Sequence, residues 1–174
     1  GIATNTSTGL MGVVYAGTGS LTLGSTGNTY LVNTRISNGT LKLGASEVIP
    51  DGFITAAATT TVGSTASTTV TAPTAGLYPG MTITGGSASA TISSITSATA
   101  FVASVAQTIT SGTNLTFNIG RGNVVIDPVA TVTATFDLNG QSETINGLTA
   151  ISAGNAVITN SAAGPAFLTF GANN

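Results

Sequence analysis

Short runs of alternating apolar and polar residues, each ended by Gly or Asn, constrain this fold more than any other feature. Ser20-Leu-Thr-Leu-Gly24 and Gly39-Thr-Leu-Lys-Leu-Gly44 both have the two-residue period of a β-strand. The motif returns near the other end of the chain as Phe167-Leu-Thr-Phe-Gly171. Short strands that recur with turn residues between them are typical of stacked β-coils. We therefore expect one repeat to open near the start of the chain and another to begin at its end.

The residue types favour an ordered, all-β protein. Of the 174 residues, 41% are hydrophobic and 5% are charged, whereas disordered chains are rich in charge and poor in apolar residues. β-Branched residues and Gly dominate, and no window of the sequence shows the 3.6-residue period of an amphipathic helix. We therefore expect strands throughout and no helix.

The composition also excludes several classes of function. Three Lys or Arg residues and a net charge of −2 provide no basic patch, so we expect no nucleic-acid partner. No apolar run approaches the roughly 18 residues of a membrane-spanning helix, so we expect no membrane insertion. The chain has no His and no Cys, which excludes Ser–His triads and most transition-metal sites. The sequence thus predicts a protein that is not an enzyme, with no catalytic residues, cofactor or metal.

The carboxylates leave one alternative open, because some β-helical enzymes work with Asp and Glu alone. Asp127 with Asp137, or Glu47 with Asp51, are the pairs that would have to converge, and the same acids are the candidates for a calcium site. Asp51 and Asp137 stand beside turn residues, where an Asp side chain commonly caps the turn. We prefer the turn-capping interpretation.

The chain divides into two flanks and a middle. Residues 1–54 and 119–174 carry the Gly- and Asn-punctuated strands, whereas 55–118 contains no charged residue and is rich in Thr and Ala. The middle still shows several strand-like runs separated by Pro and Gly, among them 68–72, 81–84, 90–95, 100–105 and 114–117. These runs favour an inserted small β-sandwich or barrel over a flexible spacer.

The flanks share a longer pattern, in Leu21-Thr-Leu23, Asn28-Thr-Tyr30 and Gly39-Thr-Leu-Lys-Leu-Gly-Ala45, then in Gly122-Asn-Val-Val-Ile126 and Glu143-Thr-Ile-Asn-Gly-Leu148. This pattern resembles the autotransporter-associated β-strand repeat of bacterial surface proteins. Similar proteins run from Pro-Asp-Gly almost directly into Gly-Asn-Val, and here the insert splits those two pieces. The insert, through Ala75-Gly-Leu-Tyr-Pro-Gly-Met81, resembles small β-modules of phage fibres and bacterial surface proteins. The resemblance implies a right-handed parallel β-helix, or β-solenoid, that lies outside the cell or on its surface.

In a β-solenoid the inward side chains of successive coils stack into a dry column. We expect that column to contain Leu21, Leu23, Ile36, Leu41, Leu43, Val124, Ile126, Phe136, Leu138, Ile145, Leu148, Val157 and Ile158. The Asn-Gly pairs at 38–39, 139–140 and 146–147 mark the sharpest corners. With so few charges, we expect stability to vary little with pH and salt.

A solenoid leaves unpaired backbone on its first and last coils, which invites end-to-end contact. The strand containing Leu168 and Phe170 and the strand containing Val13, Val14 and Tyr15 are the predicted subunit contacts. Contact between two different ends propagates as a fibre. The sequence therefore predicts a secreted structural subunit that polymerises with copies of itself into an extracellular filament or sheath. The alternative is a fragment of a larger autotransporter-like passenger or adhesin, with a glycan or surface contact through the insert left open.

Overall fold

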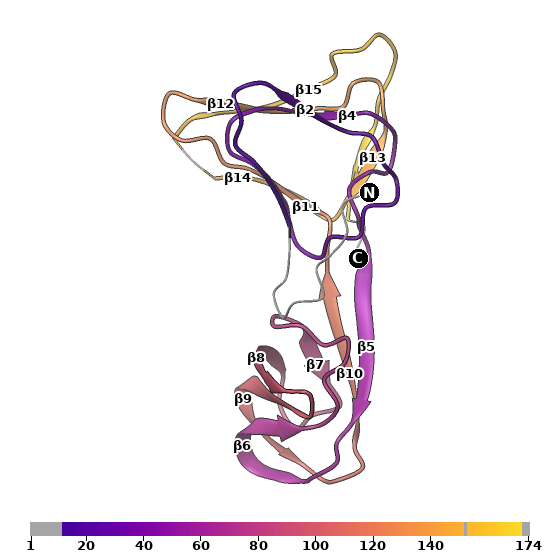
Figure 1. Cartoon of the computed structure of the whole chain (residues 1–174), viewed down its shortest axis with the longest axis vertical. Coiled ribbons are helices and arrows are strands. Elements are labelled where there is room, and N and C mark those ends of the chain that lie inside the picture. The colour runs from indigo at the N-terminus through magenta and orange to yellow at the C-terminus, as the bar shows by residue number, and fades with distance from the viewer. Residues whose placement is uncertain (1–11, 152, 172–174) are drawn as a thin grey trace. The chain divides into compact units, whose positions relative to one another are not determined.

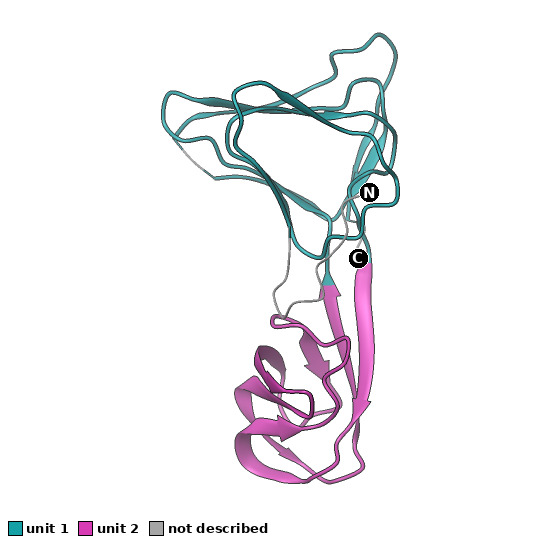
Figure 2. Ribbon diagram, viewed as in Figure 1, with its two compact units in different colours: residues 1–5, 11–52, 120–174 teal, residues 6–10, 53–119 magenta. Residues whose placement is uncertain are grey.

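The computed structural model describes residues 12–151 and 153–171, and these contain strands and turns but no helix. They form two compact units (Figure 2). Unit 1 comprises the described residues of 11–52 and 120–174, and unit 2 includes 53–119. The sequence placed the corresponding divisions at 54/55 and 118/119.

Unit 1 is built from parallel sheets stacked as a β-solenoid, and Figure 1 shows its strands superposed along the sides of a triangle. The first sheet contains, in spatial order, β1 (Val13–Tyr15), β3 (Thr34–Ile36), β11 (Asn123–Ile126) and β14 (Gly147–Ala150). The second contains β2 (Ser20–Leu23), β4 (Gly39–Leu43), β12 (Thr133–Asp137) and β15 (Asn155–Thr159). The third pairs β13 (Glu143–Ile145) with β16 (Leu168–Phe170).

Each pass around unit 1 carries one strand of both larger sheets. We name these passes coil 1 (residues 12–33), coil 2 (34–52), coil 3 (120–146) and coil 4 (the described residues of 147–171). Coils 2 and 3 are adjacent in the sheets although unit 2 separates them in the sequence. The Arg121 amide donates a hydrogen bond to the Gly52 carbonyl oxygen at 3.0 Å. The insertion therefore leaves and re-enters unit 1 at neighbouring points.

The inward column is present, and most of its predicted members are confirmed as buried: Leu23, Ile36, Leu41, Leu43, Val124, Ile126, Phe136, Leu138 and Ile145. The prediction for Val157 is wrong. Val157 pairs with Thr135 in the ladder, while its neighbour Ile158 pairs with the buried Phe136. Successive side chains of a strand point to opposite faces, so Ile158 faces inward and Val157 outward.

Two of the three Asn-Gly pairs form sharp corners. Asn139 and Gly140 have φ values of 50° and 78°, which is the combination of a type I′ turn. Gly39 has a φ of 65°, and a Cβ atom there would lie 2.2 Å from the Gly17 carbonyl oxygen, so no larger residue fits. The third pair differs, because Gly147 begins β14 without a positive φ.

Unit 2 is the inserted β-module. Its strands follow the order β5 (Phe53–Thr59), β10 (Asn114–Gly120), β7 (Thr82–Thr84), β8 (Ala90–Ser97), β9 (Ala100–Ile109) and β6 (Ser64–Thr71). From β10 to β6 the neighbours pair antiparallel. The unit has its own core, in which the rings of Phe101 and Phe117 meet edge to face at 5.6 Å. Much of the Thr- and Ala-rich run lies in β5 and β6 and is therefore strand.

Candidate assembly surface at the ends of the coils

Among the described residues, the inward column is dry in coils 2 and 3 and includes exposed apolar residues in coils 1 and 4. One ladder position aligns Leu21, Leu41, Phe136 and Ile158 across coils 1 to 4. Leu41 and Phe136 are fully buried, whereas Leu21 is 36% exposed and Ile158 is 45% exposed. The end members are the same kind of side chain in the same orientation, and they differ in having a coil on one side only.

Coil 4 shows the same exposure on its other strands. Leu168 and Phe170 pair with the buried Glu143 and Ile145, so both face inward, yet Phe170 is 55% exposed. Leu148 stands above the buried Val124 and is only partly covered. The open end of coil 4 is therefore an apolar surface bordered by the edge strands β14, β15 and β16.

The structure separates the five predicted contact residues by the direction in which they point. Val13 and Tyr15 pair with the buried Thr34 and Ile36, so they face inward on coil 1. Val14 pairs with the exposed Arg35 and is 67% exposed, so it lies on the outer face. Leu168 and Phe170 face inward on coil 4. Leu10 and Met11, which precede this strand in the sequence, lie outside the described residues.

Two residues at these ends were expected only as buried members of the column. Leu21 and Ile158 are the half-exposed ends of a ladder position that is otherwise dry. The signal that could have indicated their exposure is that they lie in the first and last strands of the repeat. The sequence placed both residues in the column, but without the register it did not show that they share one ladder position.

Charge is absent from both end coils. Residues 12–33 and 147–171 contain no Asp, Glu, Lys or Arg, whereas coils 2 and 3 contain all eight charged residues of the chain. Soluble proteins commonly protect a free sheet edge with charged residues, Lys above all. Neither end of this stack has that protection.

The charged residues gather at the seam between coils 2 and 3. Arg35 of coil 2 forms an ion pair with Asp127 of coil 3, and the Lys42 Nζ atom lies 3.7 Å from an Asp137 carboxylate oxygen. The Arg121 Nε atom donates to the Asp51 carbonyl oxygen at 2.7 Å. The Asp127 and Asp137 carboxylates thus have separate cationic partners, Arg35 and Lys42. The Glu47 carboxylate accepts hydrogen bonds from the amide and the hydroxyl of Thr144.

Asp137 caps a turn, as its sequence context indicated. Its Oδ1 atom accepts hydrogen bonds from the amides of Asn139 and Ser161, both at 2.9 Å, and its Oδ2 atom accepts one from the Ser161 hydroxyl at 2.6 Å. Burial raises the pKa of this carboxyl, but the bonds from Ser161 and Asn139 and the charge of Lys42 outweigh it, so the pKa is lowered overall. Asp137 therefore joins coil 3 to coil 4 as a carboxylate.

Glu143 is the buried carboxyl of the seam. Its Oε2 and Oε1 atoms accept hydrogen bonds from the amides of Val48 and Ile49, at 2.9 and 3.0 Å, and the residue is 1% exposed. Burial raises the pKa of Glu143 to about 7, against the two amide bonds that lower it, and the nearby charges of Glu47 and Asp51 raise it further. On this side of the coils β13 has no strand of coil 2 beside it, and the Glu143 side chain bonds the backbone amides of coil 2 instead. Sequence reasoning missed this role, because nothing local to Glu143 indicates that it points inward.

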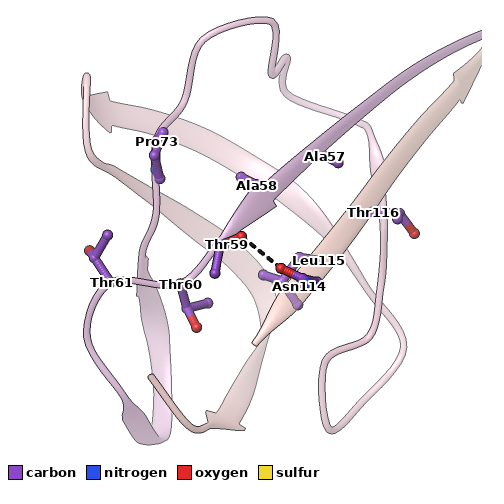
Figure 3. Close-up of a pocket in the computed structure, with 9 residues that line it drawn as sticks. All are labelled: Ala57, Ala58, Thr59, Thr60, Thr61, Pro73, Asn114, Leu115 and Thr116. Carbon is purple, nitrogen blue, oxygen red and sulfur yellow. Dashed lines mark hydrogen bonds between the residues drawn. The ribbon is translucent and has the colours of Figure 1, made fainter. Parts of the chain in front are cut away.

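Unit 2 carries an open pocket of about 450 Å³ beside β5 and β10 (Figure 3). Its lining includes Thr59 and Asn114, whose side chains are joined by a hydrogen bond of 2.7 Å, and otherwise consists of Ala, Thr, Pro and Leu. These groups offer hydroxyls and an amide but no charged or aromatic side chain.

In the part of the chain that the structure describes, no group of three or more Asp or Glu residues is arranged to hold a metal ion. The same part contains no helix long and apolar enough to cross a membrane. No protein-family model, curated protein or solved structure matches this chain.

Proposed function

We propose that this protein is a secreted structural subunit that assembles head-to-tail into an extracellular filament or sheath through its end coils. One observation carries the proposal: a column that is dry in coils 2 and 3 ends in the partly exposed Leu21 on coil 1 and in the partly exposed Ile158 and Phe170 on coil 4, all on uncharged edge strands. A second copy stacked on either end would continue the column and pair the free strand edges.

The apolar side chains at the open end of coil 4 are only half buried, so a second copy could bury the rest of their surface. Full burial of an Ile or Phe side chain is worth roughly 1.5–3 kcal/mol, and Ile158 and Phe170 still have about half of that to gain. Backbone pairing along β14 and β15 would add to this contribution. Because the two ends of a parallel stack are different surfaces, their contact is heterologous, and it extends as a fibre unless the rotation closes a ring.

The alternative proposal uses the same surfaces differently. Further coils of a longer chain would cover both ends in the same way, as in an autotransporter-like passenger or adhesin. In that case unit 2 would be an insertion between two coils of a longer stack, and its pocket beside β5 and β10 would be the candidate contact with a glycan or another surface. Both proposals place the protein outside the cell or on its surface, which rests on the resemblance of its repeats to those of bacterial surface proteins.

Two neighbouring residues of β15 provide a matched test. Ile158→Asp places a charge on the inward face of the open coil, and Val157→Asp places the same charge on the outer face of the same strand. We expect the parent chain and Val157→Asp to form filaments, seen by negative-stain electron microscopy and by sedimentation, and Ile158→Asp to remain monomeric. Circular dichroism should show β structure in all three.

Two results would count against the proposal. If the parent chain stays monomeric at high concentration, the ends are not an assembly surface for this chain, and the longer-passenger alternative takes its place. If Ile158→Asp assembles as readily as Val157→Asp, subunits join through some other surface.

A further inference from the structure

The ladder of unit 1 defines which residues of two copies would meet. Along the second sheet, three consecutive positions align across the coils. The outward position contains Thr22, Lys42, Asp137 and Thr159, and the inward position beside it contains Leu21, Leu41, Phe136 and Ile158. A further outward position ends in Ser20 and Val157. All pairings are parallel, so the free edge of β2 and the free edge of β15 have the polarity needed to continue the sheet.

We propose that the joint between copies repeats this ladder, with β2 of one copy parallel to β15 of the next, Leu21 over Ile158 and Thr22 over Thr159. This inference rests on the proposed function and specifies its partner as a second copy of this chain in one register. In the first sheet the same rule places β1 on β14, with Val13 over Leu148.

Two features of the end strands select that register. A slip by one residue would place Thr22 over Ile158 and turn every inward side chain of β2 outward. A slip by two residues would place Leu23 over Ile158, but Leu23 is already 5% exposed and has little surface to bury. The proposed register joins the half-exposed Leu21 to the half-exposed Ile158.

The uncharged character of the ends favours another copy of this chain as the occupant. A partner selected by charge would find no charged residue on coil 1 or coil 4. A second copy brings the matching edge, because its coil 1 already stacks on a coil 2 through the same ladder positions that coil 4 leaves open.

The absence of Cys from the chain allows a direct test by engineered disulfides. In the proposed register, Thr22→Cys and Thr159→Cys of adjacent copies lie on neighbouring strands about 4.8 Å apart, within the range of a disulfide. Within one copy two strands separate these positions, so they are roughly 14 Å apart and cannot pair. The control combines Thr22→Cys with Val157→Cys, which stay about 8 Å apart in the proposed register.

We expect mild oxidation of assembled Thr22→Cys/Thr159→Cys protein to give a ladder of covalent oligomers on a denaturing gel. Reductant should collapse the ladder, and the Thr22→Cys/Val157→Cys protein should remain mostly monomeric. If filaments form but the control crosslinks instead, or neither variant does, the register is wrong while the proposed function stands. If the parent chain forms no filaments, the proposed function fails and the register falls with it.

Discussion

Glu143 gives the fold an unusual dependence on pH. Burial raises its pKa from 4.5 to about 7, so the folded protein holds this proton more tightly than the unfolded chain does. For a group with a raised pKa, the stabilising contribution is fully present below the unfolded value and is lost as the pH rises through the folded value. We therefore expect unit 1 to lose stability between pH 4.5 and pH 8, where most proteins are near their maximum.

The size of the effect follows from the two pKa values. The difference between 7 and 4.5 sets an upper limit of roughly 3 kcal/mol. Between pH 4.5 and 8 the free energy of unfolding should fall by about 3 kcal/mol. Asp137 acts in a separate window, because a lowered pKa contributes stability that is present above the unfolded value of 3.8 and is lost as the pH falls through the folded value.

Urea unfolding followed by circular dichroism from pH 4.5 to 8, at concentrations where the chain is monomeric, measures this slope. Glu143→Gln does not titrate in this range, so it should remove the slope. Its single acceptor oxygen serves only one of the two amides of Val48 and Ile49, so the slopes of the two proteins are compared and not their absolute stabilities. Asp127→Asn removes one negative charge from a partly exposed ion pair and should leave the slope unchanged. A parent profile that is flat between pH 4.5 and 8, or a slope that survives in Glu143→Gln, would refute the reasoning.

Two further predictions concern the insertion and the turn after β12. Replacing Phe53–Ile119 by a short Gly-Ser linker should leave unit 1 cooperatively folded, because the Arg121 amide already bonds the Gly52 carbonyl; a broad, non-cooperative urea transition would show that the coils need the insert. Asp137→Ala should cost about 2 kcal/mol in urea unfolding, since it removes the acceptor of two amides and the Ser161 hydroxyl. Asp137→Asn, which keeps one acceptor oxygen, should cost less, and equal losses in the two variants would mean that these bonds contribute little.

The sequence was informative where the pattern is local. Two-residue alternation located most strands of unit 1, and the uncharged stretch located the insertion, because both signals lie within a few neighbouring residues. The same signal failed at Val157 and Ile158, where two apolar residues stand side by side. Alternation alone does not decide which of them faces the core, and the pairing of Ile158 with Phe136 decides it.

The seam between coils 2 and 3 was beyond sequence reasoning for a different reason. Glu143 accepts a hydrogen bond from the amide of Ile49, which lies 94 residues earlier in the chain. Unit 2 separates the two residues in the sequence. No short-range pattern reports such a contact. The expectation of little pH dependence treated all the charges as exposed, whereas the Asp137 and Glu143 carboxyls are 4% and 1% exposed; the urea measurements across pH will decide between the two predictions.

The distribution of charge suggests that register is set in different ways at the seam between coils 2 and 3 and at the end coils. Coils 2 and 3 must find each other across the whole inserted unit, so no short connection sets their register. Directed contacts do so instead: Arg35 with Asp127, Lys42 with Asp137, and the Glu143 carboxyl with two backbone amides. The partly exposed Arg35–Asp127 pair is worth only about 0–1 kcal/mol, so its main effect here is to disfavour wrong registers, whereas the Asp137 and Glu143 carboxyls are buried. A joint between copies also lacks a connection, but it has no charges. The register of the proposed joint therefore depends on the apolar column. Substitutions at Leu21 and Ile158 should for this reason affect assembly most.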